Sequence, residues 1–164
     1  MPTTITDVEV FDVRFPTAET GDGSDAINRG DYSATYVEVR TDTGPAGAGL
    51  TFTNGRGNEL TCGAVRALAH QVVGATVEDL AADQVTFWRS LTADPQLRWL
   101  GPEKGVIHMA AGALVNAVWD LRARLAGKPM WQFLAEMPAE ELVASVDFRH
   151  ITDEITPAEA LELL

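Results

Sequence analysis

The chain has 164 residues, of which 46% are hydrophobic and 22% charged, a composition typical of a soluble globular domain and not of a disordered segment. Its formal net charge is −12, from 24 acidic and 12 basic residues. Such a charge repels nucleic acid phosphates and anionic lipid surfaces, so we expect neither nucleic acid nor a membrane as a partner.

Three runs near the start of the chain have the composition of β-strands. They cover residues 5–15, 32–41 and 46–53. Apolar and polar residues alternate in the second run, and in the third Ala48, Leu50 and Phe52 share one side. A Gly-Pro pair between these two runs favours a tight turn. The sequence therefore predicts a three-stranded antiparallel meander with one face turned toward a core.

The connection between the first two strands is the segment TGDGSDAINRGDY, from Thr20 to Tyr32. It is much longer than the roughly two to five residues that a hairpin turn needs. Its glycines allow unusual backbone angles, and its Asp, Ser and Asn side chains supply hydrogen-bonding groups. A solvated loop without function is one interpretation. We favour a lid or binding loop, in which Tyr32 closes one wall of a pocket and donates a hydroxyl hydrogen bond.

After the third strand the hydrophobic period changes to that of helices. We expect a helix over about 58–73, ended by Gly74, and then helical sequence from the N-cap Thr76 to a break at 94–95. The longest helix is expected within 101–129. It is apolar around most of its circumference, so it should be largely buried.

The end of the chain carries two further signals. The segment LVASVDFRHI, residues 142–151, predicts a strand, and TPAEALELL predicts a helix start with Thr156 as the cap and Pro157 at the first helical position. A strand of a parallel sheet buries both faces and needs neighbours, which the rest of this sequence does not supply. We therefore expect the start of an incomplete second unit.

Few residues have the spacing of a catalytic or metal site. Cys62 is the only cysteine, so no disulfide can form within the chain, and its apolar helical position favours a buried inert thiol over a nucleophile. The histidines His70, His108 and His150 have no second metal ligand at helical or hairpin spacing, and no cofactor motif is present. The glycines of GAGLTFTNGRG are expected to serve strand packing and a turn.

A polar stripe recurs every four residues along the longest predicted helix. Its members are His108, Gly112, Asn116, Asp120 and Arg124. This spacing places successive side chains near one another. A polar relay is one interpretation; a hydrogen-bonded seam inside a packed helix bundle is the other, and we favour the seam because buried polar groups need partners in any case.

One segment has the pattern of a known family. NAVWDLRARLAGKPMWQFL, from Asn116 to Leu134, resembles the helix signature that closes the N-terminal domain of the mandelate racemase and muconate-lactonising branch of the enolase superfamily. Six ordered motifs are similar to the L-fuconate dehydratase subgroup: DVRFPT, GSDAINRGDYSATYV, LTFTNGRGNE, LRWLGPEKGVIHMA, NAVWDL and DFRHITD. The resemblance runs from about Val8 to the last residue.

The resemblance implies an α+β fold in two parts. Residues 1–136 would form an N-terminal capping domain, a three-stranded antiparallel meander followed by a helical bundle. Residues 137–164 would be the start of an incomplete barrel domain, including the first strand of a (β/α)7β barrel. The resemblance also implies that four residues contact the substrate: Gly23, Ser24, Asp25 and Tyr32.

The implied reaction is the dehydration of L-fuconate to 2-keto-3-deoxy-L-fuconate and water through an enediolate stabilised by Mg²⁺. The metal ligands and catalytic bases of such enzymes lie beyond residue 164. No catalytic or metal-binding residue is therefore assigned in this chain, and the chain alone is expected to be inactive. The implied partners are a small sugar acid, the barrel domain of the same protein and further copies of it in a homo-oligomer.

Two alternatives remain open. The first is another acid-sugar dehydratase of the same superfamily. The second is a truncated, non-catalytic cap that acts as a binding or assembly module, although an unpaired strand near the C-terminus would favour aggregation. The first residues, MPTTITDVEV, lack the basic start and apolar run of a signal peptide, so we expect a cytoplasmic protein.

Overall fold

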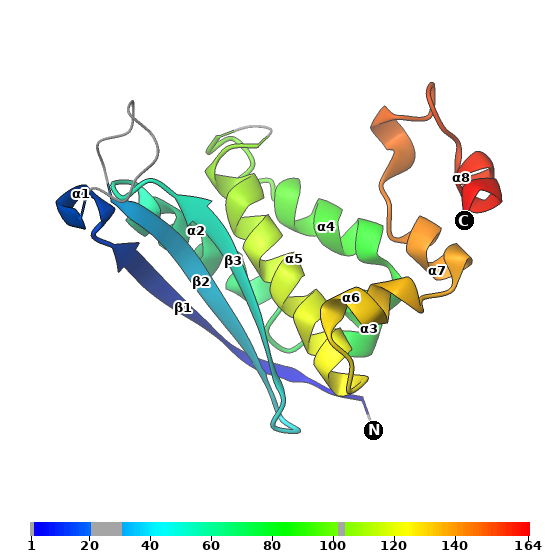
Figure 1. The fold of residues 1–164 in the computed structure, drawn as a ribbon, viewed down its shortest axis with the longest axis horizontal. Coiled ribbons are helices and arrows are strands. Elements are labelled where there is room, and N and C mark those ends of the chain that lie inside the picture. The colour runs from blue at the N-terminus through cyan, green and yellow to red at the C-terminus, as the bar shows by residue number, and fades with distance from the viewer. Residues whose placement is uncertain (1, 21–30, 102–103) are drawn as a thin grey trace.

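The three expected strands form and pair in sequence order (Figure 1). They are β1 (Ile5–Phe15), β2 (Tyr32–Thr41) and β3 (Ala46–Thr53), and they make one antiparallel sheet in the order β1-β2-β3. Phe11, Tyr36 and Leu50 lie opposite one another across the sheet. The predicted meander is confirmed. This computed structural model describes residues 2–20, 31–101 and 104–164.

Most of the remaining described chain is helical. The helices are α1 (Thr17–Thr20), α2 (Asn58–Leu68), α3 (Val77–Ala82), α4 (Gln84–Thr92), α5 (Val106–Leu125), α6 (Met130–Ala135), α7 (Ala139–Ala144) and α8 (Pro157–Leu163), with short 3₁₀ turns η1 (Ala69–Gln71) and η2 (Phe148–His150). None of the described helices is both long and apolar enough to cross a membrane.

The expected helix caps are present, with one addition. The Thr76 hydroxyl accepts a hydrogen bond from the backbone N–H of Asp79 at 3.1 Å and begins α3. The helical sequence that follows is not continuous, because the Asp83 carboxylate accepts from the N–H of Thr86 at 2.8 Å and starts α4 as a separate helix. Asp83 has the side chain of a good N-cap, so this break had a readable local signal.

The sheet meets α5 through a face of glycines. A Cβ atom at Gly49 would lie 2.6 Å from the backbone nitrogen of Ala117, and one at Gly47 would lie 2.5 Å from Cβ of Leu121. Only residues without a side chain allow this close approach of strand and helix. The opposite side of β3, with Ala48, Leu50 and Phe52, is therefore turned away from the core, and Phe52 is 56% exposed.

The core lies between the sheet, α5 and the helices α2 and α4. Fully buried side chains come from each of these elements: Val37 and Val39 of β2, Val65 and Leu68 of α2, Leu91 of α4, and Leu114, Val118 and Leu121 of α5. The long helix is thus largely buried, as its sequence predicts. Cys62 belongs to the same interior, with 1% of its surface exposed, which fits an inert thiol.

The predicted strand near the C-terminus does not form. Residues 139–144 are helix α7 instead, and residues 148–150 are the 3₁₀ turn η2, in which Asp147 accepts a hydrogen bond from the N–H of Arg149. A strand needs a neighbouring strand for its backbone hydrogen bonds. The described part of the chain offers only β1–β3, and Figure 1 places the C-terminal segment across α5 from them.

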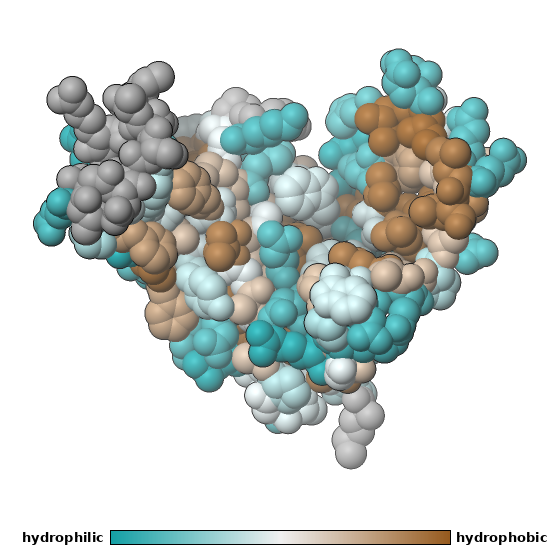
Figure 2. Space-filling view, in the orientation of Figure 1, coloured by the Kyte–Doolittle hydropathy of each residue, from teal (hydrophilic) through white to brown (hydrophobic). Residues whose placement is uncertain are grey.

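The expected helix after this segment is confirmed. Thr156 and Glu159 make a capping box at the start of α8, with the Thr156 N–H donating to the Glu159 carboxylate at 2.8 Å. Figure 2 shows apolar residues gathered over this C-terminal segment, and the side chains of Val146, Ile151 and Leu163 are exposed. The segment therefore presents an apolar surface to its surroundings.

Candidate functional site

Of the four predicted substrate contacts, the structure places one. Gly23, Ser24 and Asp25 lie outside the described residues. Tyr32 begins β2 and is half-buried, and its backbone N–H donates to the Thr17 hydroxyl at 3.1 Å. Its ring packs against the ring of Phe52, with the ring centroids 5.4 Å apart. The end of the long loop is thus anchored to the C-terminal end of β3.

A second loop lies beside Tyr32. Gly55 and Gly57, which follow β3, have φ angles of +72° and +101°, and these positions need glycine because other residues are strained there. The Gly55 N–H donates to the Ser33 hydroxyl at 2.7 Å, and a Cβ atom at Gly55 would lie 3.0 Å from the carbonyl oxygen of Asp31. We call Tyr32, Phe52 and the turn 54–57 the loop-end site.

Sequence reasoning found only half of the loop-end site. The segment TNGRGN predicts a turn from its glycines, but nothing local indicates that this turn lies against residues 31–33. That contact follows from the pairing of β2 with β3, which places Ser33 opposite Thr53. The strand register, combined with the turn signal, was the information that could have found it.

Asn58 supports the turn 54–57 through hydrogen bonds to all three strands. It is fully buried and its side chain makes four hydrogen bonds: it accepts from Thr35 Oγ1 at 2.9 Å and from Thr53 Oγ1 at 2.6 Å, and it donates to the Asp12 carboxylate at 2.5 Å and to the Ala34 carbonyl at 3.2 Å. One side chain thereby joins all three strands at the position where the turn leaves β3.

Several charged side chains near the loop-end site are already paired with one another. Arg14 forms ion pairs with Asp12 at 2.7 Å and with Glu59 at 2.9 Å, and its guanidinium, with help from the amide of Asn58, lowers the pKa of Asp12. Arg14 Nη1 also donates to the carbonyl oxygen of Gly55 at 3.1 Å, so this cation supports the turn itself.

Arg56 is a further cation among the described residues at this end. It lines a cavity of about 400 Å³ together with Phe52, Asn54, Leu60 and Met109. Among the described residues it has no hydrogen-bond or ion-pair partner. An uncommitted guanidinium beside an aromatic ring and amide groups suits a small polar acid, because guanidinium binds carboxylates in bidentate fashion.

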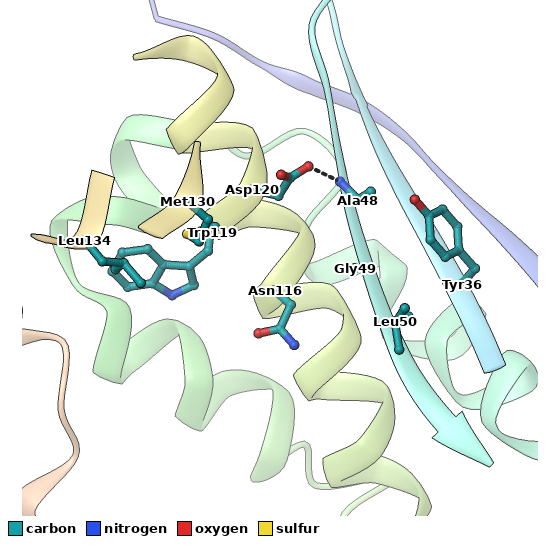
Figure 3. Close-up of a pocket in the computed structure, with 9 residues that line it drawn as sticks. All are labelled: Tyr36, Ala48, Gly49, Leu50, Asn116, Trp119, Asp120, Met130 and Leu134. Atoms are coloured by element: carbon teal, nitrogen blue, oxygen red, sulfur yellow. Dashed lines mark hydrogen bonds between the residues drawn. The ribbon is translucent and has the colours of Figure 1, made fainter. Parts of the chain in front are cut away.

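A further cavity, of about 630 Å³, lies elsewhere, along the free edge of β3 (Figure 3). Asp120 of α5 points toward this edge, and its carboxylate accepts from the Ala48 N–H at 2.8 Å and from Arg124 Nε at 2.6 Å, whereas Asn116 lies one turn earlier on α5. The carboxylate therefore protects an edge strand and completes its backbone hydrogen bonding. It is already satisfied, and the rest of this cavity is mostly apolar.

The polar stripe of α5 forms neither a polar relay nor a hydrogen-bonded seam inside a helix bundle. Asp120 bonds to the sheet edge, Asn116 is exposed, and a Cβ atom at Gly112 would meet nothing within 4 Å. His108 instead packs edge-on against Trp88, with ring centroids 5.7 Å apart. Helical spacing brings Asp120 and Arg124 together as an ion pair at 2.6 Å, but Asn116 and His108 lie in other surroundings, so no continuous relay or buried seam results.

Comparisons with known proteins agree with this architecture. The family model "Mandelate racemase / muconate lactonizing enzyme, N-terminal domain" matches residues 24–135. L-galactonate dehydratase of Hypocrea jecorina is 52% identical over 162 residues, which are 98% of this chain and 36% of that protein. Mitochondrial enolase superfamily member 1 of Homo sapiens is 50% identical over 163 residues, 98% of this chain and 37% of that protein.

Solved structures give the same result. The crystal structure of human mitochondrial enolase superfamily member 1 has a TM-score of 0.95 at 49% identity and covers 99% of this chain and 38% of that chain. The L-talarate dehydratase of Polaromonas, complexed with Mg and L-glucarate, has a TM-score of 0.63 at 19% identity, covers 87% of this chain and 40% of that one, and shows likeness of fold alone. The chain thus spans little more than a third of these relatives.

Proposed function

Because the chain belongs to the N-terminal domain family of the mandelate racemase and muconate lactonizing enzymes, in the enolase superfamily, we propose that it is the capping part of an acid-sugar dehydratase. The observation that carries the proposal is 52% identity to an L-galactonate dehydratase over 98% of the chain. In this proposal residues 1–136 form the cap, and residues 137–164 lead into the catalytic barrel of the same protein.

The proposed substrate is a six-carbon aldonic acid of the L-galacto series. The relative acts on L-galactonate by its name, whereas the motifs resemble L-fuconate dehydratases. These two acids share the configuration of their hydroxyl carbons and differ only at C6, which carries a hydroxyl in one and is a methyl carbon in the other. The whole protein would remove the proton at C2, release the C3 hydroxyl as water and give the 2-keto-3-deoxy acid.

The cap's own contribution would be to bind and enclose this substrate. We propose that Gly23, Ser24, Asp25 and Tyr32 contact the sugar acid, with Ser24 and Asp25 bonding hydroxyls and the Tyr32 hydroxyl donating from the loop-end site. Closure of such loops excludes water from the reacting carbons. Arg56 adds a positive charge on the same side, which favours approach of the carboxylate.

We propose that the whole protein uses Mg²⁺, which would stabilise the charge that develops on the substrate carboxylate. Within residues 2–20, 31–101 and 104–164, no group of three or more His, Cys, Asp or Glu side chains is arranged to hold a metal ion.

Tyr32→Phe tests the proposal in the whole protein, with Tyr36→Phe as the matched control. The chain has only these two tyrosines, and Tyr36 lies on the same strand away from the loop-end site. Loss of one hydroxyl hydrogen bond should lower kcat/KM for L-galactonate or L-fuconate about fivefold, and the control should be unchanged. Equal kinetics of the two variants would contradict a substrate contact at Tyr32.

A substrate panel separates the alternatives. We expect Mg²⁺-dependent dehydration of L-galactonate and L-fuconate, and we expect Asp25→Ala to impair turnover while metal binding stays intact. Preference for a diacid would instead favour another acid-sugar dehydratase. A whole protein that binds sugar acids but turns none over would support the non-catalytic binding module. A homo-oligomer stays a prediction, which sedimentation of the whole protein would test.

A further inference from the structure

Two segments far apart in the sequence line one cavity that the proposed function does not use. The cavity measures about 470 Å³ and lies between the start of α5 and the turn η2. We call it the basic cavity. It is lined by Trp88, Lys104, His108, Met109, Asp147, Arg149 and His150. They come mainly from the motifs GPEKGVIHMA and DFRHITD.

The turn η2 is fixed to the helical core by one carboxylate. Asp147 accepts from Arg89 Nη2 at 2.6 Å and from Arg89 Nε at 3.0 Å, and it pairs with Arg149 Nε at 2.8 Å. The Arg89 guanidinium lowers the pKa of Asp147 to about 2, so this carboxylate is charged and fully engaged at neutral pH. It therefore orders the rim of the cavity and is not available as a general base.

The described charged groups around the basic cavity have an excess of positive charge. Asp147 faces two guanidinium groups, those of Arg89 and Arg149, and Lys104 adds a third positive charge. Neither Lys104 nor His150 has a hydrogen-bond or ion-pair partner among the described residues. Such an excess of positive charge is unusual in a chain of net charge −12. It creates a local attraction for anions against the field of the molecule.

Two further features strengthen the attraction. Trp88 and His108, in edge-on contact with ring centroids 5.7 Å apart, add apolar surface to the lining, and charges interact more strongly beside such a surface. Lys104 has a φ angle of +66°, and among the described residues it is the only non-glycine residue with a positive φ. This conformation is strained for lysine, and strain of this kind is often retained where a side chain must be held in place.

We propose that the basic cavity binds a small, doubly charged oxyanion of the phosphate class. Lys104 and Arg149 supply positive charges, and the imidazole of His150 adds an N–H donor. With Asp147 paired to Arg149, the described lining keeps one net positive charge, that of Lys104. The N–H groups of Lys104, Arg149 and His150 provide several donors, which match the oxygen atoms of a phosphate better than the two of a single carboxylate. The proposal requires no sugar acid, so it does not depend on the proposed substrate, although Arg149 and His150 lie in the segment that leads into the proposed barrel.

The three histidines of the chain make the test direct, since each gives its own imidazole NMR signal. Inorganic phosphate is titrated at constant pH and ionic strength, with acetate as the singly charged comparison. We expect saturable shifts of the His108 and His150 signals and tighter binding of phosphate than of acetate. His70, which is exposed on η1, reports non-specific effects.

The two lysines of the chain provide the variant and its control. Lys104→Gln should weaken phosphate binding about threefold or more, whereas Lys128→Gln, which removes a lysine paired with Glu136, should leave it unchanged. Lys104→Gly is a second variant, which removes the charge and relieves the backbone strain together. Equal shifts at His70, no saturable shift at His108 and His150, or equal titrations of the Lys104 and Lys128 variants would overturn the proposal.

Discussion

The network beneath the loop-end site makes Asn58→Ala the most informative single substitution. The alanine removes a buried amide that bonds Asp12, Ala34, Thr35 and Thr53. Because this amide joins the three strands below the turn 54–57, its loss should both destabilise the fold and loosen the loop-end site. Stability gives the cleaner number, since it does not depend on any substrate.

The expected loss of stability depends on which partners of Asn58 keep another hydrogen bond after the substitution. Asp12 keeps its ion pair with Arg14, and Thr53 keeps the Ser33 hydroxyl at 2.6 Å, so neither group is left without a partner. The Ala34 carbonyl loses its amide donor in a buried position. Four lost hydrogen bonds at about 0.5–1.5 kcal/mol each, reduced by these alternative partners, predict a loss of about 3 kcal/mol in the free energy of unfolding.

The assay is equilibrium unfolding in urea, followed by circular dichroism, with Asn116→Ala as the control. Asn116 is exposed on α5, where alanine is the better helix former, so the control should be neutral or slightly stabilising. A loss of about 3 kcal/mol corresponds to a Tm decrease of roughly 6–12 °C for a protein of this size. If Asn58→Ala unfolds at the same urea concentration as the control, the amide network does not hold the turn.

Further predictions concern packing and pH. Gly49→Ala should cost about 2 kcal/mol or more, or prevent folding, because its Cβ collides with α5, whereas Gly112→Ala should add up to about 1 kcal/mol; equal thermal unfolding of the two variants would refute the close approach. The pKa of Asp147 is lowered from its ordinary value of 3.8 to about 2 in the folded protein. The ion pair with Arg89 therefore contributes fully to stability above pH 3.8, and this contribution is lost as the pH falls through about 2. Urea unfolding should show Asp147→Asn about 1 kcal/mol less stable near pH 6, a modest value because Arg89 is 41% exposed, and the difference should disappear as the pH falls through the folded-state pKa of about 2. A difference that persists at low pH would assign it to packing.

Local signals predicted much of the fold. Alternation identified β2 and β3, strand-like composition identified β1, and cap residues such as Thr76 and Thr156 identified helix starts. These features depend on residues within a few positions of one another, so they can be read from a single sequence. The same reasoning predicted Tyr32 at the end of the long loop, although its role in substrate binding stays a prediction.

What the sequence by itself determined is therefore the meander, the long buried helix and the turn positions, because backbone geometry and hydrophobic period act locally. Only the tertiary structure decided which side of β3 meets α5 and that residues 148–150 form a turn and not a strand. It also decided that Gly55 lies beside Asp31, and that Lys104 and Arg149 line the same cavity. Those outcomes depend on which distant partners are present, since a strand requires a neighbour and a charge cluster requires two segments to meet.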